Sequence, residues 1–330
     1  MDPVNVLLVV PHEVGSTDRY EEVLQRRFPT EIAGGAIRIR KSVSGDLPDE
    51  FLDTHIIGTG TLIPRIPEMK DLKWIMSFSS GVDHWHKFGK VPAHVPLVNL
   101  PGGSAVPVAE FILGLMLTLA KKYNRLWDEQ RERRYTRIYG DELYGKTLGL
   151  VGLGGIGREV AKRAKGFDMR IIGTATRKVE VPGVDEVYLA GRVEDVIRQS
   201  DFLVLACPET ADTLGLMNEA RFRLMKKTAY LINCARGSLV VREALLRALN
   251  EGWIAGAAQD TWWTKDPVPS YLPPGDEIRN AANLIITPHI SGFTRMYEQR
   301  FGNAFADNIA RYLHGEPLIN LVSGFGTGRA

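Results

Sequence analysis

A glycine-rich turn constrains the fold of this chain more than any other feature. The apolar run Thr147–Val151 leads into Gly152, Gly154 and Gly157, which have the spacing G-x-G-x-x-G. In such a turn the first glycine allows a sharp exit from a strand, the second lets backbone N–H groups approach a pyrophosphate, and the third lets a helix pack closely on the strand. The pattern predicts a dinucleotide-binding βαβ unit, and a purely structural glycine turn is the alternative.

Short apolar runs alternate with helix-like segments on both sides of this turn. The runs before it are Val4–Val10, His55–Gly60, Trp74–Phe78 and Pro96–Leu100. The runs after it are Arg170–Gly173, Phe202–Ala206, Ala229–Asn233, Gly256–Gln259 and Leu284–Thr287. Such alternation is typical of parallel sheets that are covered by helices. We therefore predict an α/β protein with two doubly wound parallel-sheet domains, the second a six-stranded Rossmann domain.

The length of 330 residues also favours about two domains. A long helix-like segment, from Ser104 to Tyr135, separates the two series of runs, and a last one, from Thr294 to His314, follows the second series. Because nothing after it can complete a domain, we expect this last helix to return to the first. The expected domains are 1–102 plus 293–330, which binds substrate, and 103–292, which binds the dinucleotide. We expect the glycine-rich tail 324–330 to be disordered.

Composition excludes several other classes of protein. The net charge is +2, which does not favour binding to nucleic acid or to an anionic membrane. The longest apolar stretch, Phe111–Ala120, is about half of a membrane span. The two cysteines, Cys207 and Cys234, lie in or beside apolar runs and do not form a disulfide framework. We therefore expect a soluble, cytoplasmic protein.

Two ionisable residues each follow an apolar run in the second series. Arg236 offers a planar, permanently charged fork that can hold a carboxylate and polarise the carbonyl beside it. His289 is a side chain that can deliver a proton near neutral pH. Ligands gather at the carboxyl ends of parallel strands, so we predict that both are catalytic. No metal site is expected, because His84 and His86 have no third ligand nearby.

The residues after the second strand of the Rossmann unit indicate which dinucleotide binds. An NAD site usually has an acidic residue there for the ribose 2′-OH. Here Ala175 takes that position, followed by Thr176, Arg177 and Lys178. A hydroxyl and two positive charges suit a 2′-phosphate, so we predict NADP in preference to NAD; a basic surface loop is the alternative.

Several segments in the same order resemble the D-isomer-specific 2-hydroxyacid dehydrogenases. They are Trp74–His84, Asn99–Glu110, Gly152–Gly157, Cys207–Thr210, Asn233–Gly237, Gly256–Asp260 and Thr287–Gly292. The resemblance implies a flavodoxin-like first domain and a two-fold dimer built on the helix from Ser104. It also implies that Arg236 binds the substrate carboxylate and carbonyl oxygen while His289 protonates that oxygen as hydride arrives.

The resemblance extends to the remaining site residues. The loop of Phe78, Ser79, Ser80 and Gly81 would supply backbone N–H groups to the substrate carboxylate. Asp260 and the backbone of Cys207 and Pro208 would border the nicotinamide. The expected cofactor-binding residues are Gly152, Gly154, Gly155, Ile156, Gly157, Thr176, Arg177, Lys178, Cys207, Pro208, Ala235, Asp260 and Gly292.

The chain departs from the family at the acidic partner of the histidine. In the family an acidic residue, usually Glu, follows the Asp260 position by about five residues. Lys265 stands there without a gap, and Asp266 matches only if one residue is inserted. Asp266 is therefore the candidate partner of His289, and the alternative is that no partner exists. Trp262 and Trp263 either wall the substrate pocket or belong to the core.

The function that these features favour is reduction of a small 2-keto acid, similar to glyoxylate or hydroxypyruvate, to a D-2-hydroxy acid by a homodimer that uses NADP or NAD. One alternative is a dinucleotide-sensing regulator that resembles the corepressors of this fold, which would bind cofactor without turnover. Another is a dehydrogenase of the same family for a different donor such as formate.

Overall fold

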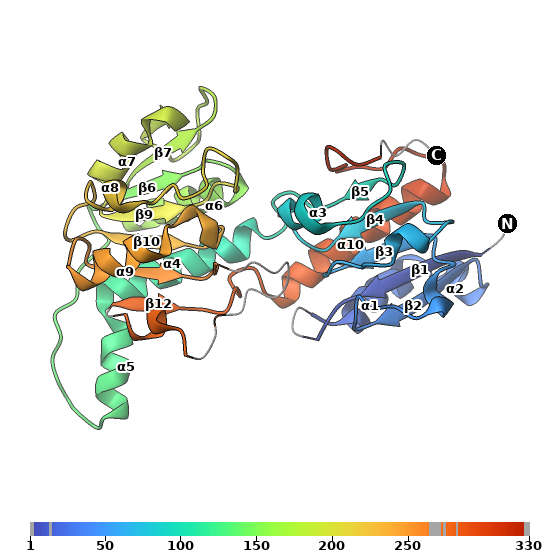
Figure 1. Cartoon of the computed structure of the whole chain (residues 1–330), viewed down its shortest axis with the longest axis horizontal. Coiled ribbons are helices and arrows are strands. Elements are labelled where there is room, and N and C mark those ends of the chain that lie inside the picture. Colours follow the sequence, from blue (N-terminus) through green and yellow to red (C-terminus); the bar gives the residue numbers. More distant parts are fainter. Residues whose placement is uncertain (1–2, 13–14, 264–271, 273–274, 282, 327–330) are drawn as a thin grey trace. The chain divides into compact units, whose positions relative to one another are not determined.

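The computed structural model describes residues 3–12, 15–263, 272, 275–281 and 283–326. It divides the chain into two units, one of Met1–Ser104 with Phe293–Ala330 and one of Ala105–Gly292. The first unit is therefore made from two separate pieces of chain, and the second unit lies between them in sequence (Figure 1).

The first unit contains a parallel sheet in the order β2-β1-β3-β4-β5, with five strands among its described residues. Its strands are β1 (Val4–Val9), β2 (Ile37–Ser42), β3 (Ile56–Thr59), β4 (Trp74–Ser77) and β5 (Leu97–Val98). Its helices are α1 (Thr17–Arg27), α2 (Pro29–Ala33), α3 (Asp83–Phe88) and α10 (Arg295–Leu313), with 3₁₀ turns at Asp49–Phe51 and Ile66–Glu68. The strand order is that of a flavodoxin-like sheet.

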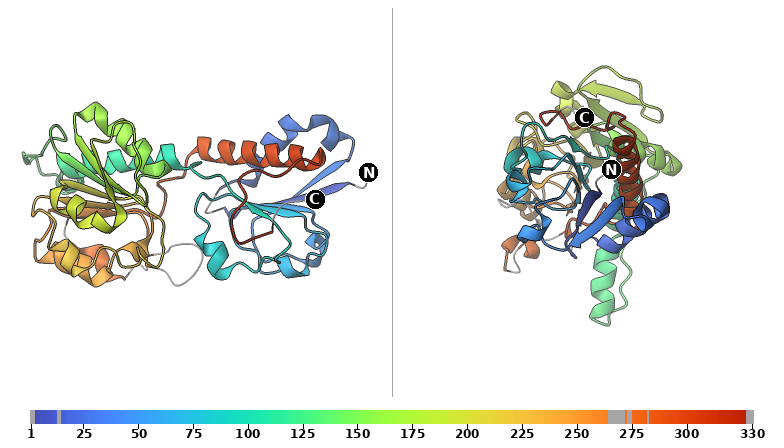
Figure 2. Two further views of the ribbon diagram at one scale, coloured as in Figure 1. Left: turned by 90° about the horizontal axis from the view of Figure 1, so that it is seen from above. Right: turned by 90° about the vertical axis from the view of Figure 1, so that its right-hand side faces the viewer.

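Helix α10 completes the core of the first unit. It packs beside α1 (Figures 1 and 2), and its Phe301 and Phe305 are fully buried with strand residues such as Val6 and Trp74. The ring of Phe305 meets the edge of Trp74 at a centroid distance of 5.5 Å. The last helix thus covers one face of a sheet that the first hundred residues build.

The second unit contains a parallel sheet in the order β12-β11-β10-β9-β6-β7-β8, with seven strands in its described part. Its strands are β6 (Thr147–Val151), β7 (Arg170–Ala175), β8 (Glu186–Leu189), β9 (Phe202–Leu205), β10 (Tyr230–Asn233), β11 (Gly256–Gln259) and β12 (Leu284–Ile286). The order reverses between β6 and β9, as in a Rossmann fold, so both sheets are doubly wound.

Helices cover both faces of this sheet. They are α4 (Ala105–Lys121), α6 (Gly155–Ala164), α7 (Val193–Gln199), α8 (Glu219–Phe222) and α9 (Arg242–Asn250), whereas α5 (Tyr123–Arg131) extends away from the sheet (Figure 1). Short 3₁₀ turns occur at Lys165–Phe167, Ala190–Arg192, Gly237–Leu239 and Glu277–Asn280. Two hydrophobic clusters, one on each face, form the core, and α4 contributes eight buried residues to one of them.

The structure corrects three expectations about individual elements. The expected helix from Ser104 to Tyr135 is two helices, because the backbone of Lys122 is left-handed, with φ of 54°, and ends α4. The second sheet has one more strand than expected, since β8 was missed, as was β2 in the first. The tail is ordered in its described part, residues 324–326, where the Gly326 N–H donates to the Val95 carbonyl at 3.2 Å, and its last four residues lie outside the described part.

Candidate active site

Five strands of the second unit end at the same level of the sheet, because their last residues are paired with one another. In the register, Val151 pairs with Leu205, Leu205 with Asn233, Asn233 with Gln259, and Gln259 with Ile286. The glycine turn, the Cys207 segment, the Arg236 turn, Asp260 and the His289 segment each follow one of these strands. The structure therefore brings these five segments to the same carboxyl edge, where open parallel sheets bind ligands.

The glycine turn has a different requirement at each of its three glycines. Gly152 has a φ of 106°, and a Cβ there would lie 2.8 Å from the Ala206 carbonyl oxygen. A Cβ on Gly157 would lie 2.1 Å from the carbonyl oxygen of Gly152. A Cβ on Gly154 would meet no atom of the described chain within 4 Å. The fold therefore explains the first and third glycines, whereas the second borders open space that a ligand can use.

The helix after this turn faces the same open space with its first N–H groups. Helix α6 begins at Gly155, and the N–H groups of its first turn, on Gly155, Ile156 and Gly157, have no acceptor within the helix. Arg158 is the first to make the regular bond, from its N–H to the Gly154 carbonyl at 3.0 Å. Free N–H groups and the positive end of a helix dipole suit a pyrophosphate. The residues present thus fit a dinucleotide.

The three residues expected at the adenosine ribose follow strand β7. Thr176, Arg177 and Lys178 are all exposed. Among the described residues, neither cation makes a salt bridge, in contrast to most arginines of this unit. The two charges are therefore available to an anion from solution.

The segment after β9 carries Cys207 and Pro208. Burial raises the pKa of the Cys207 thiol from its ordinary 9.0 to about 11. At neutral pH this group is an uncharged thiol, so it is neither a nucleophile nor a proton donor of useful acidity. What this segment offers a ligand is its backbone and an apolar surface.

The Arg236 turn is fixed by Asn233, a residue that the sequence had not singled out. Its side-chain oxygen accepts the Ala235 N–H at 3.1 Å, and its side-chain nitrogen donates to the Arg236 carbonyl at 2.8 Å. Asparagine at the end of a strand commonly builds such a turn, which is a signal the sequence did contain. Ala235 is buried, Arg236 is half-buried, and its Nη1 donates to the Ala235 carbonyl at 2.8 Å.

His289 lies in a turn that Asp260 holds on both sides. The buried Asp260 carboxylate accepts the Thr287 hydroxyl at 2.6 Å and the N–H groups of Ile290 and Ser291 at 3.0 and 3.1 Å. His289 itself is exposed and has a φ of 58°, a left-handed conformation that is uncommon for residues other than glycine. These three contacts of Asp260 lie in the histidine turn, and its expected place beside the nicotinamide stays a prediction. Half-buried Gly292 ends that turn.

In the first unit, the loop after β4 presents backbone N–H groups. No acceptor in the described part of the chain takes the N–H of Ser79, Ser80 or Gly81. The N–H of Phe78, by contrast, donates to the Thr59 carbonyl at 2.7 Å, and its ring stacks on Tyr20 at 3.9 Å. Ser80 is held by its hydroxyl, which donates to the Leu100 carbonyl at 3.0 Å. The set of free donors is thus Ser79–Gly81, while Phe78 serves the core.

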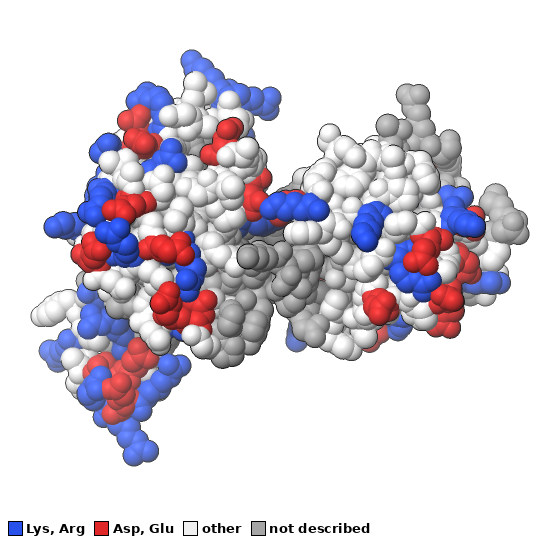
Figure 3. Space-filling view, viewed as in Figure 1, with Lys and Arg blue, Asp and Glu red and all other residues white. Residues whose placement is uncertain are grey.

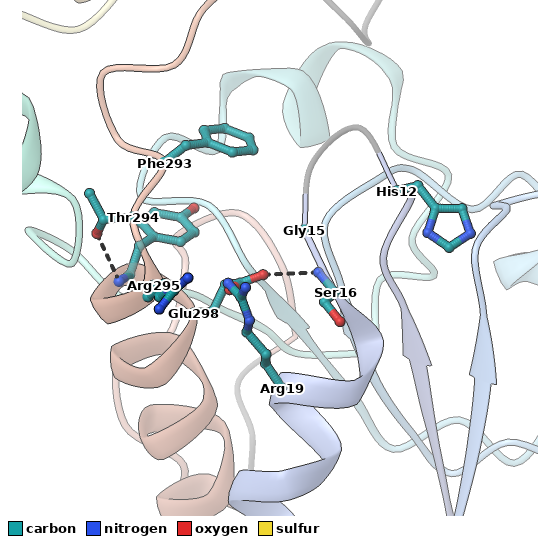
Figure 4. A pocket seen from close by; sticks show the side chains of 9 residues that line it. His12, Gly15, Ser16, Arg19, Phe293, Thr294, Arg295 and Glu298 are labelled. Atoms are coloured by element: carbon teal, nitrogen blue, oxygen red, sulfur yellow. Dashed lines mark hydrogen bonds and ion pairs between the residues drawn. The ribbon is translucent and has the colours of Figure 1, made fainter.

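A cavity of about 420 Å³ lies in the first unit where β1 leads into α1 and α10 begins (Figure 4). Buried Glu298 accepts the Ser16 N–H at 2.9 Å and pairs with Arg19. Beside it, the Tyr297 hydroxyl donates to the Phe78 carbonyl at 2.5 Å. The cavity is therefore linked through one side chain to the Ser79–Gly81 loop. It is lined by His12, Gly15, Ser16, Arg19, Phe293, Thr294, Arg295, Tyr297 and Glu298.

Three further observations concern other residues and sites that the sequence raised. Asp266, the candidate partner of His289, lies outside the described residues, as does Lys265. Within the described residues, no group of three His, Cys, Asp or Glu side chains has the geometry to hold a metal ion. No helix in that part of the chain combines the length and hydropathy needed to cross a membrane.

Comparisons with known proteins identify the family of this chain. The family model "D-isomer specific 2-hydroxyacid dehydrogenase, NAD binding domain" matches residues 113–291. Glyoxylate reductase of Pyrococcus horikoshii is 33% identical over 321 residues, which cover 92% of this chain and 92% of that protein. Glyoxylate reductase of Pyrococcus furiosus is 42% identical over 298 residues, covering 84% and 86%.

A solved structure is similar over nearly the whole chain. The crystal structure of a D-isomer specific 2-hydroxyacid dehydrogenase family protein from Aeromonas salmonicida subsp. salmonicida superposes with a TM-score of 0.84 at 25% identity. The match covers 97% of this chain and 99% of that one. The chain therefore belongs to the D-isomer specific 2-hydroxyacid dehydrogenases, a family of NAD(P)-dependent oxidoreductases.

Proposed function

We propose that this protein reduces a small 2-keto acid, of the glyoxylate or hydroxypyruvate type, to the corresponding D-2-hydroxy acid. The observation that carries the proposal is that neighbouring parallel strands end at residues paired with one another. The glycine turn, Arg236 and His289 all come just after these strand ends. Both relatives described above are glyoxylate reductases.

In this reaction Arg236 and His289 have different tasks. The Arg236 guanidinium holds the substrate carboxylate and draws electron density from the neighbouring carbonyl. The His289 imidazolium donates its proton to the carbonyl oxygen as negative charge develops there, and it returns to the neutral imidazole. A reduced nicotinamide, when bound, supplies the hydride to the carbonyl carbon. The Ser79–Gly81 N–H groups add hydrogen bonds to the carboxylate, and Asp266 is the candidate acid that keeps His289 protonated.

The test is turnover by the purified protein with a panel of 2-keto acids, followed at 340 nm. We expect Arg236→Ala to lower kcat/KM roughly 100-fold, since loss of charged hydrogen bonds costs about 3 kcal/mol. Arg236→Lys keeps the positive charge but loses the planar guanidinium, and we expect its kcat/KM to lie between those of the wild type and Arg236→Ala. Arg236→Ala at the wild-type rate would refute the mechanism. Cofactor binding without any turnover would favour a dinucleotide-sensing regulator, and turnover with formate alone a different donor.

We further propose that NADP(H) is preferred to NAD(H). Arg177 and Lys178 are exposed cations without an ion pair in the described chain, and Ala175 leaves no carboxylate to repel a 2′-phosphate. Thr176 adds a hydroxyl. Two charged contacts of this kind suit a dianionic phosphate better than a ribose hydroxyl.

The preference is measured as the ratio of kcat/KM for NADPH to that for NADH. We expect the double variant R177A/K178A to lower this ratio at least tenfold by raising KM for NADPH alone. Lys227→Ala is the matched control, because this exposed lysine precedes β10 and so lies at the opposite edge of the sheet. An unchanged ratio in the double variant would remove these residues from cofactor selection.

We also propose a homodimer, with its contact surface on an arm formed by residues 123–144. This arm comprises α5 and the connection to β6, and it extends away from the sheet of the second unit (Figure 1). Trp127, Tyr135, Tyr139 and Tyr144 are 52%, 101%, 93% and 70% exposed. Large aromatic side chains are enriched at protein interfaces, and a second copy of the chain is the partner that this family resemblance implies.

A further inference from the structure

The segment after β11 joins the two turns that carry Arg236 and His289. Trp262 is 5% exposed, and its indole N–H donates to the Thr287 carbonyl at 3.0 Å. Trp263, its neighbour, donates from its indole N–H to the Val240 carbonyl at 2.5 Å. The two side chains therefore reach in two directions, one toward the histidine turn and one toward the chain that follows the arginine turn.

The arginine turn also touches this segment through its backbone. A Cβ on Gly237 would lie 2.3 Å from the carbonyl carbon and oxygen of Trp262 and 2.9 Å from the Trp263 nitrogen. Glycine is required at 237 because the two stretches of main chain are in direct contact. The position of Trp262 is thus set by the turn that bears Arg236.

The histidine turn needs support on both sides. Because the φ of His289 is 58°, its surroundings have to hold the backbone in a conformation that it rarely adopts alone. Asp260 binds the N–H groups on the far side, at Ile290 and Ser291. On the near side, Thr287 donates its N–H to the Gln259 carbonyl at 3.1 Å, and its own carbonyl accepts the Trp262 indole.

We propose that Trp262 is a positioning residue for His289. Its indole N–H fixes the Thr287 carbonyl, two residues before the histidine, against a segment that rests on the Arg236 turn. The distance from the carboxylate-binding group to the proton donor is thereby held by the protein itself. This inference rests on the proposed function, in which both groups act on one substrate, and it assigns to the indole a task beyond core packing.

The test compares W262F, which keeps an aromatic ring and removes the N–H, with W253F. Trp253 donates its indole N–H to Glu251 at 3.1 Å, just before β11 and so at the opposite edge of the sheet. We expect W262F to lower kcat about tenfold while KM for the 2-keto acid stays within about twofold, because misplacing a catalytic group slows the chemical step more than it weakens binding. We expect W253F to match the wild type in both constants.

A second measurement needs no turnover. The ring signals of the seven histidines are recorded by NMR on histidine-labelled protein, and the His289 signal is identified by its absence in H289N. We expect this signal to move or broaden in W262F and to stay in place in W253F. W262H, which restores a ring N–H, should recover part of the lost kcat.

Each outcome decides one question. A wild-type kcat and an unmoved His289 signal in W262F would overturn the positioning role, as would equal kcat values for W262F and W262H. A wild-type protein that turns over no 2-keto acid would refute the proposed function. In that case a His289 signal that still moves in W262F alone would leave the positioning role standing.

Discussion

At the scale of single residues, the Asp260 carboxylate makes three hydrogen bonds to one five-residue turn. In Asp260→Asn, one carboxylate oxygen becomes an NH₂ group, which cannot accept a backbone N–H. We expect the free energy of unfolding to fall by about 1–3 kcal/mol, because a buried donor is left without its acceptor. Urea unfolding of the cofactor-free protein measures this.

The neighbouring residue supplies the control. The hydroxyl of Thr261 is buried and has no hydrogen-bond partner among the described residues. Thr261→Val removes that hydroxyl at nearly constant volume, so its stability should equal or exceed that of the wild type. If both variants lose the same stability, local packing rather than the carboxylate supports the turn.

The raised pKa of the Cys207 thiol predicts that the free energy of unfolding falls at alkaline pH. Its folded pKa is raised to about 11 by burial, against an ordinary value of 9.0. The unfolded thiol therefore releases its proton first, and the stabilisation is complete below about pH 9 and lost as the pH rises to about 11. We expect the unfolding free energy of the wild type to decline in this window more steeply than that of Cys207→Ala, by about 1 kcal/mol per pH unit. Parallel pH profiles in urea unfolding would contradict this.

At the scale of elements, the glycine turn separates folding from binding. Gly157→Ala places a Cβ 2.1 Å from the Gly152 carbonyl oxygen, so we expect a lower melting temperature without cofactor. Gly154→Ala meets nothing within 4 Å in the described chain, so its melting temperature should be unchanged. Its Kd for NADPH should nevertheless rise about tenfold, because the added methyl group occupies the space that faces the pyrophosphate. Wild-type binding by Gly154→Ala would place the cofactor elsewhere.

The sequence predicts the central strands and two of the edge strands, β5 and β12, but it misses the edge strands β2 and β8. Central strands such as β6 and β9 are buried along their whole length and appear as apolar runs. The missed strands lie at sheet edges, and β2, with the sequence Ile-Arg-Ile-Arg-Lys-Ser, is buried at one residue only. The end of α4 before Lys122 was also missed, because neither Gly nor Pro marks it in the sequence.

In the candidate site, too, the sequence predicts some features and not others. Gly152, Arg236 and His289 could be found because each follows an apolar run, and the carboxyl ends of parallel strands meet at one edge. The bond from Trp262 to the Thr287 carbonyl could not, because it depends on the rotamer of one side chain and on the path of a distant turn. The donor set of the first unit needed the structure too, since only hydrogen bonding distinguishes Phe78 from Ser79.

At the scale of the whole molecule, the exposed aromatic arm predicts the oligomeric state. Charged residues of both signs cover α5 (Figure 3), and pairs such as Arg134 with Glu129 lie along the arm itself. We expect the wild type to sediment as a dimer and the double variant W127E/Y139E as a monomer, because charges would have to be buried at the contact. Phe88→Glu, at an exposed aromatic outside the arm, is the control. A wild-type monomer would refute the proposed dimer.

The return of α10 to the first unit also has a consequence for synthesis on the ribosome. The nascent chain completes residues 105–292 before α10 emerges, so the inner unit can fold while the outer one still lacks the helix that covers its sheet. Until then, the face bearing Val6, Ile56 and Trp74 has no cover from Phe301 and Phe305. A chain that ends between Gly292 and Arg295 would contain the whole inner unit but no α10, so the uncovered apolar face of its first sheet would make it a target for chaperones and proteases.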